Sequence, residues 1–114
     1  MKPSVLLKKI EWLKGSRGSL KAFPDQARYQ AGSELLLVQE GKAPTDWKPM
    51  PGIGPGAIEI RIHMPYEHRV IYVAKFSEAI YVLHCFEKKT QKTLKRDIDK
   101  ARSAYAEMQS IRKR

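Results

Sequence analysis

Cysteine is nearly absent from this chain, which has Cys85 as its single example among 114 residues. One cysteine excludes both a disulfide framework and a zinc site built on cysteine ligands. Cys85 lies within an apolar, strand-like run and has no partner cysteine, so we expect a reducing compartment.

Long apolar runs are missing as well. No stretch approaches the roughly 18 apolar residues of a membrane-spanning helix, and the N-terminal residues lack the apolar region of a signal peptide. We therefore expect a cytoplasmic protein with no membrane partner. The chain has 114 residues, of which 42% are hydrophobic, so residues 1–114 are predicted to form one domain around a single core.

Acidic residues are few relative to basic ones. The 22 Lys and Arg outnumber the 12 Asp and Glu and give a formal net charge of +10. Residues 88–114 carry ten basic and three acidic side chains, and so account for most of this excess. Such concentration favours a polyanionic partner, above all nucleic acid, although a solvated basic helix explains the charge run equally well by itself.

Metal and cofactor motifs are also lacking. No cluster of Asp and Glu that would hold catalytic magnesium lies between Arg69 and Asp99, and the histidines, His63, His68 and His84, do not have zinc-ligand spacing. The glycines of residues 42–56 do not form a dinucleotide fingerprint, because no strand precedes them and prolines interrupt the segment. We expect no cofactor and no metal, so any nuclease activity should be metal-independent.

Periodicity predicts the elements of the first half of the chain. A strand is expected over residues 8–13, a short helix around 20–23, and an amphipathic helix from Pro24 to Gly41. Residues 42–56 hold four prolines and three glycines and are interpreted as an ordered surface loop. Its Trp47 either pins the loop to the core or stacks on a base.

The second half predicts a sheet followed by a helix. Residues 57–64 alternate between apolar and polar side chains, and residues 68–76 and 79–87 form an apolar hairpin suited to the centre of a sheet. A helix with an apolar stripe should begin near Thr93. The predicted fold class is α+β, with N-terminal helices, a three- to four-stranded antiparallel sheet and a C-terminal basic helix.

Basic side chains on these strands form a candidate active site. Strict alternation places Arg69 on one face with Lys75, and His84 on one face with Ile80 and Val82. If the three strands present these side chains on the same face of the sheet, Arg61, Arg69 and His84 lie close together. Lys88 and Lys89 follow the end of the last strand.

Cleavage of RNA by its own 2′-hydroxyl would suit this group. The reaction needs a proton acceptor, a proton donor and positive charge on the transition state, which histidine, arginine and lysine can supply. The alternatives are structural: His84 as a hydrogen-bonded core residue, Arg69 as the ion-pair partner of Glu59 or Glu87, and the lysines as a solvated strand exit.

Several segments resemble the phage-derived, HigB-type branch of the RelE/ParE toxin superfamily, over roughly residues 20–105. They are A-F-P-D-Q-A-R at 22–28, I-E-I-R-I at 58–62, H-R-V-I-Y-V-A-K-F at 68–76, A-I-Y-V-L-H-C-F-E-K-K-T-Q-K-T at 79–93 and K-R-D-I-D-K-A at 95–101. The most specific of these motifs is H-x-F-x-K-K-T-Q-K-T.

The resemblance implies a RelE/ParE-like α+β fold with helices on one face of an antiparallel sheet. It also implies the toxin of a type II toxin-antitoxin system, an endoribonuclease that cleaves mRNA on the ribosome without a metal. A cognate helix-turn-helix antitoxin of the HigA type would neutralise it in a hetero-oligomer.

Residue roles follow from the resemblance by position. Arg69 matches the arginine that contacts the scissile phosphate in RelE-like nucleases, and His84 matches the strand histidine of the family. The candidate catalytic residues are Arg69, His84, Lys88 and Lys89. The candidate substrate-binding residues are Arg61, Lys75, Lys92, Lys95 and Arg96.

Two other functions stay open at this point. A ParE-like relative would inhibit gyrase instead of cutting RNA, and a non-catalytic relative would bind only RNA or its antitoxin. The cluster from Lys88 to Arg96, together with His84, favours the nuclease.

Overall fold

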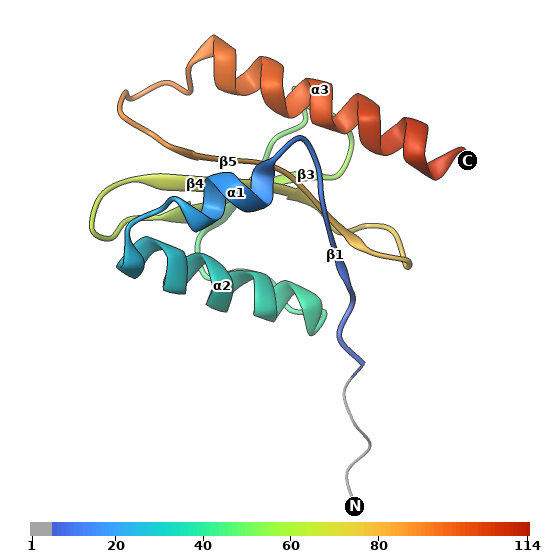
Figure 1. Cartoon of the computed structure of the whole chain (residues 1–114), viewed down its shortest axis with the longest axis horizontal. Coiled ribbons are helices and arrows are strands. Elements are labelled where there is room, and N and C mark those ends of the chain that lie inside the picture. The colour runs from blue at the N-terminus through green and yellow to red at the C-terminus, as the bar shows by residue number, and fades with distance from the viewer. Residues whose placement is uncertain (1–5) are drawn as a thin grey trace, which may run out of the picture.

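The computed structural model of the protein describes residues 6–114, whose elements form three layers, helix, sheet and helix (Figure 1). The elements in chain order are β1 (Ile10–Trp12), α1 (Ser16–Lys21), α2 (Asp25–Gln39), β2 (Trp47–Pro49), β3 (Ala57–Ile62), β4 (His68–Val73), β5 (Ile80–Glu87) and α3 (Lys95–Arg112). The predicted α+β class and C-terminal helix are confirmed. No helix within residues 6–114 combines the length and apolar character that crossing a membrane requires.

The sheet is mixed, which corrects the expected antiparallel sheet of three or four strands. Within the described residues it has five strands in the order β1-β5-β4-β3-β2. β1 runs parallel to β5, whereas the other pairs are antiparallel. The predicted hairpin forms the β4–β5 pair at the centre, because its strands are apolar on both sides and can be covered by helices on both faces.

The segment rich in proline and glycine contains β2, so its interpretation as a loop is only partly correct. β2 pairs with β3 at the edge of the sheet, where Pro49 is tolerated because an edge strand needs hydrogen bonds on one side only. Trp47 is 41% exposed there. One of the two sequence interpretations, that Trp47 anchors the segment in the core, is therefore wrong.

The two faces of the sheet have separate cores. α1 and α2 cover one face, where Ala27, Ala31, Leu35 and Val38 of α2 pack against Ile60, Ile62, Val70, Tyr72, Ile80 and Val82. α3 covers the other face, where Ala101, Tyr105 and Met108 pack against Ile71, Val73, Tyr81 and Leu83. The apolar stripe of each helix therefore determines which side faces the sheet. α3 begins at Lys95 after an extended Leu94, slightly later than the start near Thr93 that was predicted.

A β-bulge changes the face to which His84 points. Ile71 pairs with His84, but the next residue, Tyr72, pairs with Val82, so Leu83 is an extra residue on β5. An extra residue reverses the alternation of side chains. The prediction that His84 shares a face with Ile80 and Val82 is therefore wrong: those two residues pack under α1 and α2, whereas His84 faces α3.

Candidate functional site

A buried ion cluster joins β3 and β4 on the α3 side. Arg61 and Arg69 are direct partners across the two strands, and Glu59 Oε1 lies 3.7 Å from Arg61 Nε and 3.6 Å from Arg69 Nε. The Arg69 side chain is only 6% exposed, and its other nitrogens bind Glu67 Oε1 at 2.9 Å and the carbonyl of His68 at 2.9 Å. Of the two partners that the structural alternative offered for Arg69, Glu59 is present as a loose ion pair, whereas Glu87 is not and Glu67 binds instead.

The ion cluster continues to the segment before β2 through His63. His63 Nδ1 lies 2.7 Å from Glu67 Oε2, and its Nε2 lies 2.6 Å from Asp46 Oδ2. Hydrogen bonds to Asp46 and Glu67 raise the pKa of His63, and the bond to His63 in turn lowers the pKa of Glu67. Charged hydrogen bonds thus connect the segment before β2, the β3–β4 turn and β4, through Asp46, His63, Glu67 and Arg69.

His84 forms a second pair with the first turn of α3. Its Nε2 lies 2.8 Å from Asp97 Oδ1, and its ring stacks on Phe86 with centroids 5.1 Å apart and an interplanar angle of 17°. The side chain is 12% exposed and hydrogen-bonded, as the interpretation of His84 as a core residue requires, and its role in catalysis stays a prediction. Because the carboxylate of Asp97 accepts a hydrogen bond from Nε2–H, the neutral ring has Nδ1 as its proton acceptor. A carboxylate that orients an imidazole in this way is also a common arrangement for acid–base chemistry.

His84 lines a pocket of about 270 Å³ between the β1–α1 connection and α3. Lys14 and Lys100 line the same pocket, together with the hydroxyl residues Ser19 and Ser103. Lys14 is a non-glycine residue with a φ of 51°, a conformation that costs free energy and often marks a functional position. The Lys14 ammonium lies 3.3 Å from Glu107 Oε2, so it must leave that carboxylate before it can contact a bound anion. An imidazole in a pocket lined by lysines can exchange a proton with a bound phosphodiester while a lysine offsets its charge.

Sequence reasoning did not identify Lys14, Asp97 or Lys100 as members of a site. Lys14 precedes His84 by most of the chain, and only tertiary folding brings them to one pocket. Asp97 had a weak signal, since it lies in the charged helix start that follows the K-K-T-Q-K-T motif.

The other predicted basic residues lie in two places. Lys88 donates from Nζ to the carbonyl of Gln91 at 2.6 Å, and Lys89 lies 4.0 Å from Glu87. Exposed basic side chains continue from there onto α3 at Lys92, Lys95 and Arg96. Lys75 lies apart from them. It follows the C-terminal end of β4, whereas Arg69 is at the N-terminal end, and it lines a different pocket with Phe76 and Arg112.

The single thiol is not a nucleophile in this fold. Cys85 is buried, and burial raises the pKa of its thiol, so the thiolate that attacks an electrophile does not form near neutral pH. Within residues 6–114, no group of three His, Cys, Asp or Glu side chains is arranged to hold a metal ion.

Comparison with known proteins gives a family match over most of the chain. The family model described as "Phage derived protein Gp49-like (DUF891)" matches residues 19–106. This range includes His84, Asp97 and Lys100, whereas Lys14 precedes it. No curated protein matches the chain.

Proposed function

Since the chain belongs to the Gp49-like family of phage-derived proteins, a RelE/ParE-like toxin family, we propose that it is the toxin of a type II toxin-antitoxin system. Its proposed activity is that of a metal-independent endoribonuclease which cleaves mRNA on the ribosome and so stops translation and growth.

The observation that carries this proposal is the position of His84. The ring is oriented by Asp97 at 2.8 Å and lines a pocket with Lys14 and Lys100. In the proposed reaction the 2′-oxygen attacks the phosphorus and the bond from phosphorus to the 5′-oxygen breaks. His84 Nδ1 takes the proton of the 2′-hydroxyl, and the departing 5′-oxygen takes a proton from solvent, which leaves a 2′,3′-cyclic phosphate and a 5′-hydroxyl. Lys100 offsets the charge of the transition state, and Lys14 can do so once its ammonium leaves Glu107.

Arg69 has a conditional role in this mechanism. Its guanidinium is buried, binds Glu67 at 2.9 Å and forms a looser ion pair with Glu59 at 3.6 Å. A contact between Arg69 and the scissile phosphate therefore requires the phosphate to replace Glu67. The partly exposed Lys88, the exposed Lys89 and the exposed cations at the start of α3 have no buried carboxylate to displace, and we assign the remaining backbone contacts of the RNA to them.

The proposed partner is a helix-turn-helix antitoxin of the HigA type. The net charge of +10 favours a partner whose acidic side chains cover the basic surface. Association should then weaken as salt concentration rises, because surface charges are screened.

Primer extension on ribosome-bound mRNA tests the proposal, with His84→Gln as the variant. We expect induction of the natural chain to produce new cleavage sites and growth arrest, and His84→Gln to lose both while keeping the circular dichroism spectrum of the natural chain. Full cleavage by the variant would refute the role of His84. DNA breaks that depend on gyrase, without mRNA cleavage, would instead indicate a ParE-like inhibitor.

A further inference from the structure

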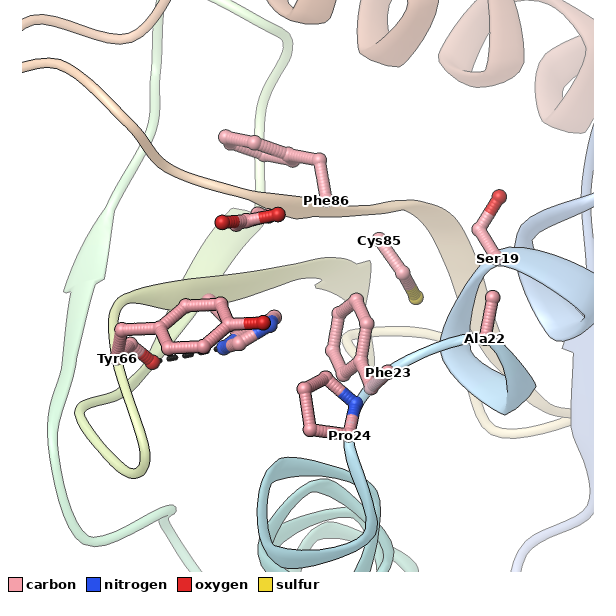
Figure 2. A pocket seen from close by; sticks show the side chains of 9 residues that line it. Ser19, Ala22, Phe23, Pro24, Tyr66, Cys85 and Phe86 are labelled. Carbon is pink, nitrogen blue, oxygen red and sulfur yellow. Dashed lines mark hydrogen bonds between the residues drawn. The ribbon is translucent and has the colours of Figure 1, made fainter.

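A second pocket opens beside Phe23, Tyr66 and Phe86 (Figure 2). Two of its lining residues, His68 and Glu87, form the strand pair next to Arg69, which places the pocket at the same end of the sheet as the ion cluster. It has a volume of about 450 Å³ and lies between the start of α2, the β3–β4 turn and the end of β5. That volume is within the range of small-molecule sites. Its lining includes Phe23, Tyr66, His68 and Glu87, which the mechanism above does not use.

The exposed aromatic ring of this pocket, Tyr66, is supported by the buried ring of His68. The rings of Tyr66 and His68 stack with centroids 4.9 Å apart at 30°, and the ring of Phe23 lies 4.5 Å from that of His68. His68 is fully buried, and its Nδ1 donates to the carbonyl of Tyr66 at 2.7 Å. Tyr66, by contrast, is 48% exposed. A positioned and accessible aromatic ring is the usual platform for a nucleobase.

The polar side of the pocket is the carboxylate of Glu87. Its side chain is 38% exposed, and its ion-pair partner, Lys89, is 4.0 Å away, which is too far for a hydrogen bond. Both carboxylate oxygens can therefore accept hydrogen bonds from a ligand. A carboxylate is complementary to two adjacent N–H donors, and among the four RNA bases only guanine carries two adjacent donors on its Watson–Crick edge.

We propose that this pocket binds a guanine base of RNA, with Tyr66 stacking on the base and Glu87 accepting from its N1–H and N2–H groups. This inference builds on the proposed function, because it takes RNA as the ligand.

The neighbourhood of the pocket fits an RNA chain. His68 and Glu87 are partners across β4 and β5, and the adjacent pair is Arg69 with Phe86. Lys88 and Lys89 follow Glu87 directly and are suited to the flanking phosphates. A guanine in this pocket would thus lie one residue pair away from the ion cluster, on the opposite face of the sheet.

Binding of the four nucleoside monophosphates to the full-length protein, followed by NMR, tests the proposal without ribosomes. All four carry the same phosphate, so differences between them report the base. We expect GMP to bind at least about tenfold more tightly than AMP, CMP or UMP, and to shift the amide signals of Tyr66 and Glu87. Glu87→Gln should remove the preference for GMP, and Tyr66→Ser should weaken the binding of all four nucleotides about tenfold.

Glu40→Gln is a matched control, because Glu40 has a similar loose ion pair, with Lys42 at 3.9 Å, but lies at the end of α2. It should leave GMP binding unchanged. Equal binding of all four nucleotides, no binding, or a Glu87→Gln variant that keeps the preference would overturn the guanine site.

The guanine pocket and the nuclease activity can be refuted independently. Preferred binding of GMP without mRNA cleavage would support the pocket and refute the proposed activity. Cleavage of mRNA without preferred binding of GMP would support the activity and refute the pocket.

Discussion

His84 Nε2 lies 2.8 Å from Asp97 Oδ1, which ties the middle of β5 to the first turn of α3. The carboxylate fixes the orientation of the imidazole, and its position near a helix N-terminus favours its negative charge. Nδ1 of His84 is thereby left as the ring nitrogen that can accept a proton.

The first prediction concerns this pair. Asp97→Asn should lower the rate of RNA cleavage at least about tenfold, and His84→Gln about a hundredfold or more, because general acid–base catalysis contributes factors of this size. The control is Asp99→Asn, which removes an exposed carboxylate two residues away whose partner is Lys95 at 3.8 Å. If Asp97→Asn cleaves at the natural rate with an unchanged pH profile, Asp97 does not position His84 for catalysis.

The second prediction concerns the buried cluster. Arg69→Ala should reduce the free energy of unfolding by about 3–5 kcal/mol, because it leaves the buried carboxylate of Glu59 with a weaker partner. Urea unfolding measures this change. The double variant Glu59→Gln with Arg69→Ala should be more stable than Arg69→Ala alone, since it removes the uncompensated charge. An Arg69→Ala protein as stable as the natural chain would show that the cluster does not support the fold.

The third prediction is a pH dependence that arises from His63. Hydrogen bonds to Asp46 and Glu67 raise its pKa above 6.5, so its stabilising effect is complete below that pH and is lost as the pH rises through the higher pKa of the folded state. The pKa of Glu67 is lowered from 4.5, so its contribution is present above that pH and is lost as the pH falls through the lower value.

The contribution of this network should therefore be greatest between pH 4.5 and 6.5. His63 is half-exposed, so we expect an effect below about 1 kcal/mol. Urea midpoints near pH 5.5 and about pH 8, compared between the natural chain and His63→Gln, measure it. We expect the natural chain to lose more stability between about pH 5.5 and pH 8 than His63→Gln does. Equal losses in the two proteins would contradict the prediction.

The fourth prediction tests the contact between the segment before β3 and α3. A Cβ at Gly54 would lie 2.5 Å from the ring of Tyr105, whose hydroxyl donates to the carbonyl of Pro55 at 2.7 Å. Gly54→Ala should therefore displace the ring and cost about 1–3 kcal/mol of unfolding free energy. Gly52→Ala is the control, because the nearest side-chain atom there is 4.0 Å away. Equal stability of the two variants would contradict this packing.

Local pattern was sufficient for much of the fold. Helical spacing predicted α2 and the buried stripe of α3, and dense β-branched and aromatic residues predicted the β4–β5 hairpin. Each of these signals depends on neighbours within a few residues, where side-chain periodicity follows directly from backbone geometry. The parallel pairing of β1 with β5 has no such local signal, because the two strands are separated by most of the chain.

The basic end of the chain, the central strands and the family resemblance follow from residue type and local order, and the amino-acid sequence is enough to find them. The surroundings of each candidate residue depend on how distant segments pack. The extra residue in β5 turns His84 toward Asp97 and α3, and the register of β3 with β4 buries Arg69 against Glu59. A bulge and a strand register arise from packing between distant segments, so the alternation of side chains along one strand could not reveal them.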